Sequence, residues 1–271
     1  LRNSSAASDV YKRQVYHGSP MPVTAFLAVS SKAAGFFVLL NLVQGPFGGI
    51  SDFLLPLLGF IATFTIFFGN LAACAQRNVK RMLGLSGVAH AGYLLVAIMA
   101  SMLFPGDSDR AVWVLFFYLF VYMTASFSVF GIMGLARTSE ESEHDFSNYC
   151  NLAEKRPWMA FVLVCGISSL AGIPPFAGFI SKVLLISVAY EAELYFSLAA
   201  MIIGVVISIF YYFGWIREIC FKPDKLHDDD SLPVDPWETV TTSGFVKIVL
   251  ISLTMASIVF GLWQAPFGNS F

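Results

Sequence analysis

Seven long apolar stretches constrain the fold of this sequence more than any other feature. A helix needs about 20 mainly apolar residues to cross the roughly 30 Å hydrocarbon core of a bilayer, and each stretch reaches that length. The stretches cover residues 21–43, 53–75, 82–104, 111–136, 158–189, 194–216 and 245–263. The composition agrees, because 57% of the residues are hydrophobic and only 13% are charged, about half the usual charged share. The sequence therefore predicts an all-α membrane protein with about seven transmembrane helices.

The fifth stretch, 158–189, is too long for one straight span and contains SLAGIPPFAGF at Ser169–Phe179. Proline removes a backbone donor, and glycine tolerates irregular dihedrals. In lipid, a broken helix is stable only where it packs inside protein or lines a wet cavity, and such interruptions mark binding sites in transporters. A simple proline kink is the alternative. The predicted break lies at Gly172, Pro174, Pro175 and Gly178.

The distribution of basic residues predicts the orientation of the chain. Ten of the sixteen Lys and Arg residues lie in the connections 76–81, 137–157 and 217–247, and only Arg110 lies in a connection on the other side. Lys and Arg concentrate in cytoplasmic loops, so we expect these three connections inside and the C-terminus on the outer side. The run Asp228–Asp230 is expected to be solvated, with a metal site as the minor alternative.

Several classes of function are excluded by what the sequence does not contain. A net charge of −2 and the lack of a long basic stretch argue against nucleic-acid binding. The four cysteines lie far apart, and no nucleotide, flavin, hydrolase or zinc motif is present. We therefore expect no catalytic residue, metal site or cofactor site in this chain. Residues 1–14 form neither a signal peptide nor a span, and we expect them to be a non-native segment.

Two lysines lie inside the apolar stretches, where each is a candidate proton carrier. Lys32 is near the middle of the first stretch, about 17 Å from either end, and a lysine there costs about 2.5–3.5 kcal/mol to insert. Burial disfavours the ammonium form, so such a lysine can exchange its proton. The alternative is a permanent cation paired with a carboxylate, which no apolar stretch supplies well inside its length. Lys182 follows the predicted break, and its alternative is to snorkel to the outer surface.

Other polar residues in these stretches suggest a path between the lysines. Ser86, His90 and Tyr93 are spaced i, i+4 and i+7 and so share a helix face, and imidazole suits proton relay. A lone buried histidine is otherwise a structural residue. The candidate path-lining residues are Ser86, Tyr93, Ser31 and Tyr211. Further polar positions are compatible with the path but more typical of helix–helix contacts: Thr63, Asn70, Tyr118, Tyr122, Ser208 and Tyr212.

Four segments carry a resemblance to a known family. They are VYHGSPMPVTAFLAVSSKAAGF from Val15, FFGNLAACAQRNVKRMLGLSGVAHAGYLLVAI at Phe67–Ile98, SLAGIPPFAGFISKVLLI at Ser169–Ile186, and FYYFGWIRE at 210–218. Over residues 15–271 the sequence resembles the subunit N family of the proton-pumping NADH–quinone oxidoreductase (respiratory complex I), one of its antiporter-like membrane subunits. Leu85 and Gly87 depart from the tyrosine and serine that are usual in that family.

The resemblance implies a fold of fourteen helices in two inverted five-helix repeats, with residues 15–271 as helices 8–14. It implies that Lys32, Lys182 and His90 are proton-transfer residues. Helices 1–7, with an essential glutamate and a further lysine, are not in this sequence, so we do not expect the chain alone to pump.

The resemblance also implies where the chain acts. Its partners would be the other membrane-arm subunits and the lipid of a bacterial inner membrane, while NADH, FMN, iron–sulfur clusters and quinone bind elsewhere in the complex. Two alternatives remain open: a subunit of a multisubunit sodium/proton antiporter, which shares this ancestry, and a structural scaffold whose lysines stay charged.

Overall fold

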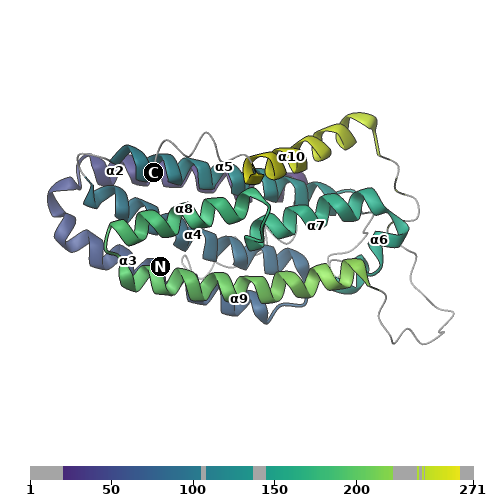
Figure 1. Ribbon diagram of the computed structural model, residues 1–271, viewed down its shortest axis with the longest axis horizontal. Coiled ribbons are helices and arrows are strands. Elements are labelled where there is room, and N and C mark those ends of the chain that lie inside the picture. The colour runs from purple at the N-terminus through teal and green to yellow at the C-terminus, as the bar shows by residue number, and fades with distance from the viewer. Residues whose placement is uncertain are drawn as a thin grey trace, which may run out of the picture.

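The computed structural model describes residues 21–104, 108–136, 145–221, 237, 240 and 242–262. The segment 1–14 and the run Asp228–Asp230, for which the sequence gave expectations, lie outside these ranges. Within them the long helices lie side by side along the long axis of the molecule (Figure 1). The long helices are α2 (Met21–Gln44), α3 (Ser51–Cys74), α4 (Val79–Leu103), α5 (Ser108–Met133), α7 (Pro157–Ala171), α8 (Ala177–Glu191), α9 (Tyr195–Cys220) and α10 (Gly244–Leu262). The short elements are η1 (Gly48–Ile50), η3 (Phe146–Tyr149) and α6 (Leu152–Lys155).

The predicted all-α membrane fold is confirmed. In the described part of the chain, six helices are long and apolar enough to cross a membrane. The fifth apolar stretch is divided into α7 and α8, which lie end to end in Figure 1 with the predicted break between them. The helix ends differ from the apolar stretches by no more than about one turn. One reason is that polar caps lie outside the apolar pattern: Asn78 accepts from the backbone N–H of Arg81, so α4 begins before its apolar residues do.

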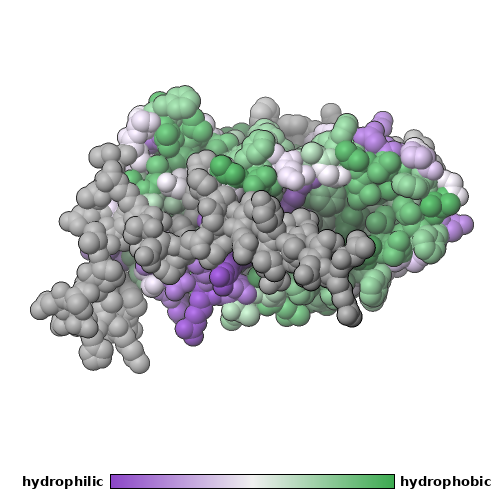
Figure 2. Space-filling model, turned by 180° about the vertical axis from the view of Figure 1, so that it is seen from behind, coloured by the Kyte–Doolittle hydropathy of each residue, from purple (hydrophilic) through white to green (hydrophobic). Residues whose placement is uncertain are grey.

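Helix α4 lies at the centre of the bundle and is buried along most of its length. The helices at the periphery expose large apolar side chains, including Phe64 on α3, Phe210 on α9 and Phe245 on α10. Figure 2 shows broad hydrophobic areas on one side of the molecule. A surface this apolar fits a protein surrounded by lipid rather than by water.

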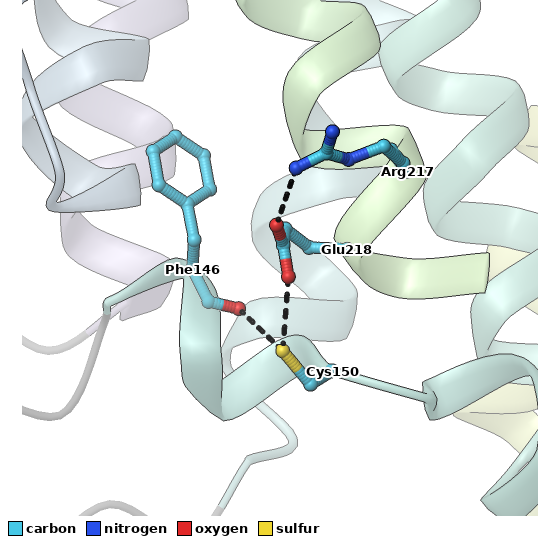
Figure 3. Close-up of polar contacts among 4 residues, drawn as sticks. All are labelled: Phe146, Cys150, Arg217 and Glu218. Atoms are coloured by element: carbon cyan, nitrogen blue, oxygen red, sulfur yellow. Dashed lines mark hydrogen bonds and ion pairs between the residues drawn. The ribbon is translucent and has the colours of Figure 1, made fainter. Parts of the chain in front are cut away.

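The connection between α5 and α7 is tied to the end of α9 by a cysteine (Figure 3). The Cys150 thiol lies 3.2 Å from a Glu218 carboxylate oxygen, to which it donates a hydrogen bond. Arg217 donates to the other oxygen of that carboxylate, at 3.3 Å. Burial and the neighbouring Glu218 carboxylate together raise the pKa of the Cys150 thiol to about 11. Cys150 is therefore a structural thiol with little thiolate at neutral pH.

Trp237 holds the connection between α9 and α10 against the same end of the bundle. Its indole N–H donates to the backbone oxygen of Asn148, at 2.7 Å. The Arg156 guanidinium donates to the Trp237 backbone oxygen in return, at 3.1 and 3.2 Å. The indole is fully buried beside the Tyr149 ring. Both long connections are thus anchored at the α7 end, although they are far apart in sequence.

We expect Glu218→Gln to increase the alkylation rate of Cys150. The substitution removes the negative charge that raises the thiol pKa, so a larger fraction is thiolate at pH 8 and the rate rises by about tenfold. The measurement is maleimide labelling at pH 8 in a variant whose other cysteines are serine, with Glu218 intact as the reference. An unchanged labelling rate in the Glu218→Gln variant would contradict this account of the thiol.

Candidate functional site

The break in the fifth apolar stretch begins where α7 ends at Gly172. This glycine has a φ of 81°, in the left-handed region that favours glycine. Its N–H donates to the backbone oxygen of Ser169, and the N–H of Ile173 donates to that of Ser168, at 3.1 and 2.9 Å. This pair of bonds is the Schellman arrangement that satisfies two of the four free carbonyls at a helix end.

Lys182 of α8 satisfies the other two carbonyls. Its ammonium donates to the backbone oxygens of Leu170 and Ala171, at 2.9 and 2.6 Å. The side chain is 4% exposed, so Lys182 does not snorkel to a surface. The negative end of the α7 dipole stabilises its charge in place of a carboxylate. A lysine on one half of the broken helix therefore caps the other half.

Close packing holds the two halves of the broken helix in this arrangement. A Cβ added to Gly178 would lie 1.7 Å from the backbone oxygen of Ser169, and one added to Gly261 would lie 2.0 Å from that of Pro175. The hydroxyl of Ser257 donates to that of Ser169, at 3.1 Å. Helix α10 thus covers the break directly. The break packs inside protein, as the sequence analysis required, and it separates two helices instead of kinking one.

Lys32 lies on α2, which packs against α5 and α4. Its ammonium donates to the Tyr122 hydroxyl of α5, at 3.1 Å, and lies 5.1 Å from the centre of that ring. The expectation that Lys32 is enclosed is only partly met, because this lysine is half-buried. Its neighbour Ser31 is exposed, because consecutive helical residues point about 100° apart. The structure therefore does not bring Ser31 to the site.

His90 lies on α4 and is buried. Its Nδ1 lies 2.7 Å from the Tyr118 hydroxyl of α5, with which it shares a hydrogen bond. Its ring is 4.9 Å from that of Tyr122, centre to centre. A cavity of about 10 Å³ adjoins these groups, which is about the volume that one water molecule needs. The residues lining the cavity are His90, Tyr118, Val121, Tyr122, Ala125, Ser169, Leu170, Gly178, Ser181 and Lys182.

The other predicted path residues of α4 take part in a second hydrogen-bond network, with α9 and α3. Ser86 of α4 shares a hydrogen bond of 2.6 Å with Tyr212 of α9. The Asn70 amide of α3 donates to the Tyr93 hydroxyl at 3.3 Å and accepts from Tyr211 at 3.2 Å. Ser86, His90 and Tyr93 therefore bond to different neighbours although they share a helix face. Helix α4 is surrounded, so a face about 60° wide reaches more than one helix.

Sequence reasoning gave too little weight to the tyrosines that complete the site. Tyr118 and Tyr122 are spaced i, i+4 on α5, so both face α4. Tyr118 orients His90, and Tyr122 receives Lys32. That spacing was the available signal, but it equally fits ordinary helix–helix contacts. Taken together, the site places one amine, an imidazole and phenol hydroxyls around one cavity at the helix break, and a second amine, that of Lys32, bonds to one of those hydroxyls. Each of these groups can exchange a proton.

Comparison with known proteins gives the following similarities. Residues 10–208 match the family described as NADH:quinone oxidoreductase/Mrp antiporter, transmembrane region. The chain is 46% identical over 255 residues to NADH-quinone oxidoreductase subunit N 1 of Opitutus terrae, covering 94% of this chain and 49% of that protein. It is 39% identical over 241 residues to subunit N of Ectopseudomonas mendocina, covering 88% and 47%. The chain thus spans about half the length of the curated relatives it matches.

Solved structures show the same fold. A chain of respiratory complex I from Thermus thermophilus with bound aureothin superposes with a TM-score of 0.73 at 27% identity, covering 92% of this chain and 51% of that chain. A chain of the Mrp complex from Dietzia sp. DQ12-45-1b gives a TM-score of 0.72 at 19% identity, covering 91% and 51%. At that lower identity the likeness concerns the fold alone.

Proposed function

This chain belongs to the NADH:quinone oxidoreductase/Mrp antiporter family, and from that membership we propose that it is the C-terminal half of a proton-translocating subunit N of NADH–quinone oxidoreductase. In this proposal Lys32, His90 and Lys182 transfer the protons. One observation carries the proposal: Lys32 and Lys182 both connect to the same small cavity, Lys32 through Tyr122 and Lys182 directly. His90 lines the same cavity.

The chemistry of the site explains how such a subunit moves protons without a cofactor of its own. A lysine held by backbone carbonyls, as Lys182 is, keeps its position whether or not it carries a proton. Moving one charge against 100 mV requires about 2.3 kcal/mol, so the driving force comes from quinone reduction. We place NADH, FMN, the iron–sulfur clusters and the quinone in other subunits of the complex. The partners of this chain are then the remaining membrane-arm subunits and the lipid bilayer.

For orientation, we propose a multi-pass protein of the bacterial inner membrane with the α7 end of the bundle facing the cytoplasm. The ten basic residues of the connections 76–81, 137–157 and 217–247 support this direction. Arg110, the one basic residue in a connection predicted on the other side, lies in the first turn of α5 and pairs with Glu191 at the end of α8, at 2.7 Å. The C-terminus then lies on the outer side.

We expect Lys32→Ala in the full-length subunit to stop proton translocation while the complex still assembles. The substitution removes the amine that donates to Tyr122 and so removes one end of the path. The measurement is acidification of vesicles that contain the complex, with the amount of assembled complex as the reference. Lys247→Ala is the control, because this exposed lysine at the start of α10 lies against Trp158, away from the cavity. Normal translocation with poor assembly would support the scaffold hypothesis instead.

A sodium/proton antiporter subunit is the competing function within the same family. The relatives that share 46% and 39% identity are named as subunit N. The similarity to a chain of the Mrp complex, in contrast, concerns only the fold. This difference favours the NADH–quinone oxidoreductase. Sodium-dependent proton exchange in vesicles that receive neither NADH nor quinone would reverse the preference.

A further inference from the structure

Among the described residues, Lys32 has a hydrogen bond to one side chain that lines the cavity. Lys32 is not among the residues that line the cavity, whereas Tyr122, which accepts the hydrogen bond from Lys32, is. The Tyr122 side chain is 6% exposed, so its hydroxyl is shielded from the surroundings of the bundle. Any proton that leaves the Lys32 ammonium along its hydrogen bond therefore reaches the Tyr122 oxygen first.

Three groups around the cavity have hydrogen-bonding capacity left over. Among the described residues, Tyr122 accepts from Lys32 but has no acceptor for its own O–H. His90 uses Nδ1 on Tyr118 and has no described partner for Nε2. Lys182 uses two of its three N–H groups on backbone oxygens. A buried water typically makes about three hydrogen bonds, so one water in the cavity can join all three groups.

The environment of Lys32 directs its ammonium toward Tyr122. A Cβ added to Gly87 of α4 would lie 2.3 Å from the Lys32 ammonium nitrogen and 3.0 Å from the Tyr122 oxygen. The amine thus occupies the space beside a glycine, with the tyrosine hydroxyl next to it. The glycine at position 87 leaves room for this hydrogen bond.

We propose that the Tyr122 hydroxyl is the relay that carries protons between Lys32 and the cavity shared by His90 and Lys182. This inference rests on the proposed function. In one concerted step, the Lys32 ammonium gives a proton to the Tyr122 oxygen as the Tyr122 O–H gives its own proton to a cavity water. The excess proton passes from that water to the neutral form of His90 or Lys182. Tyr122 stays a neutral phenol throughout, and rotation of its hydroxyl resets the relay.

Neighbouring polar groups are less suited to this role. Tyr118 lines the cavity, but its hydrogen bond goes to His90 and not to Lys32. The second network centres on the side-chain amide of Asn70, and an amide exchanges protons far less readily than a hydroxyl. Tyr122 alone among these residues joins a lysine to the cavity.

The test is Tyr122→Phe in the full-length subunit, assembled in its complex and reconstituted in vesicles. Phenylalanine keeps the ring that packs against His90 and removes only the oxygen. Loss of a positioned proton-transfer group typically slows a reaction 10²- to 10⁴-fold, so we expect proton translocation per assembled complex to fall at least tenfold. We also expect the ratio of rates in H₂O and D₂O to rise, because proton transfer from Lys32 becomes the slow step.

Tyr190→Phe is the matched control, because Tyr190 is exposed near the end of α8, away from the cavity. It is expected to translocate at the parental rate. An undiminished rate in Tyr122→Phe overturns the relay, and so does a slower rate with an unchanged isotope ratio, which indicates a structural role. If Lys32→Ala stops translocation but Tyr122→Phe does not, the relay is wrong and the proposed function stands. If neither variant affects translocation, both proposals fail.

Discussion

Replacing Lys182 by arginine is expected to abolish proton translocation while the subunit still folds and assembles. The guanidinium retains donors for the backbone oxygens of Leu170 and Ala171, which Lys182 holds at 2.9 and 2.6 Å. Arginine does not release its proton in proteins, so the site keeps its charge but loses its proton exchange. We expect translocation per assembled complex to fall at least about a hundredfold, measured by acidification of vesicles supplied with NADH and quinone.

The companion variant Lys182→Met separates the two roles of this lysine. Methionine leaves both carbonyls without a donor, and each unsatisfied buried acceptor costs about 1–3 kcal/mol of stability. We therefore expect less assembled complex as well as no translocation. Should arginine prove too large for the site, Lys182→Gln is compared with Lys182→Met instead. Glutamine keeps an N–H donor for the carbonyls but carries no exchangeable charge. Parental translocation in the arginine variant would show that a fixed cation is sufficient and would remove Lys182 from the proton path.

A single methyl group at Gly178 is expected to prevent the two halves of the broken helix from packing together. The Cβ of Gly178→Ala would lie 1.7 Å from the backbone oxygen of Ser169. Backbone atoms cannot rotate away as a side-chain end can, so α8 must shift from α7, and Lys182 shifts with it from the carbonyls at the end of α7. Overpacking of this kind costs about 1–3 kcal/mol or more. The measurement is the amount of assembled complex and its melting temperature in detergent.

Gly214→Ala is the control for the break, because it makes the same chemical change within a helix at an open position. A Cβ at Gly214 meets nothing within 4 Å, and alanine favours a helix over glycine by about 1 kcal/mol. We expect this variant to assemble normally. Equal assembly of the two variants would show that the contact between Gly178 and Ser169 does not hold the halves together.

The spans and the break could be predicted from the order of the residues, because both depend on local properties. Crossing a bilayer requires a continuous apolar stretch, and Gly172, Pro174 and Pro175 cannot continue a regular helix. The presence of Lys32 and Lys182 within apolar stretches likewise marked them as unusual. Those predictions needed no knowledge of which helices are neighbours.

The partners of the site residues required the packed structure. Lys182 bonds to backbone oxygens that are free only because α7 ends at Gly172, and no pattern of side chains encodes such acceptors. Ser31 was expected on the path, but the helix rotation that directs Lys32 toward Tyr122 leaves Ser31 exposed. The second network also shows that the hydroxyls of Ser86 and Tyr93 bond to α9 and α3. The Tyr93 ring itself lies beside His90 and Lys182.

The order of the residues therefore established which segments lie in the membrane, where one of them is interrupted, and which ionisable groups lie at that depth. The packed helices established which of those groups meet. The physical reason is that hydrophobicity and helix breaking act over neighbouring residues. A proton path, in contrast, depends on contacts of about 3 Å between helices, and these follow from how each helix is rotated and how closely its glycines allow its neighbours to approach.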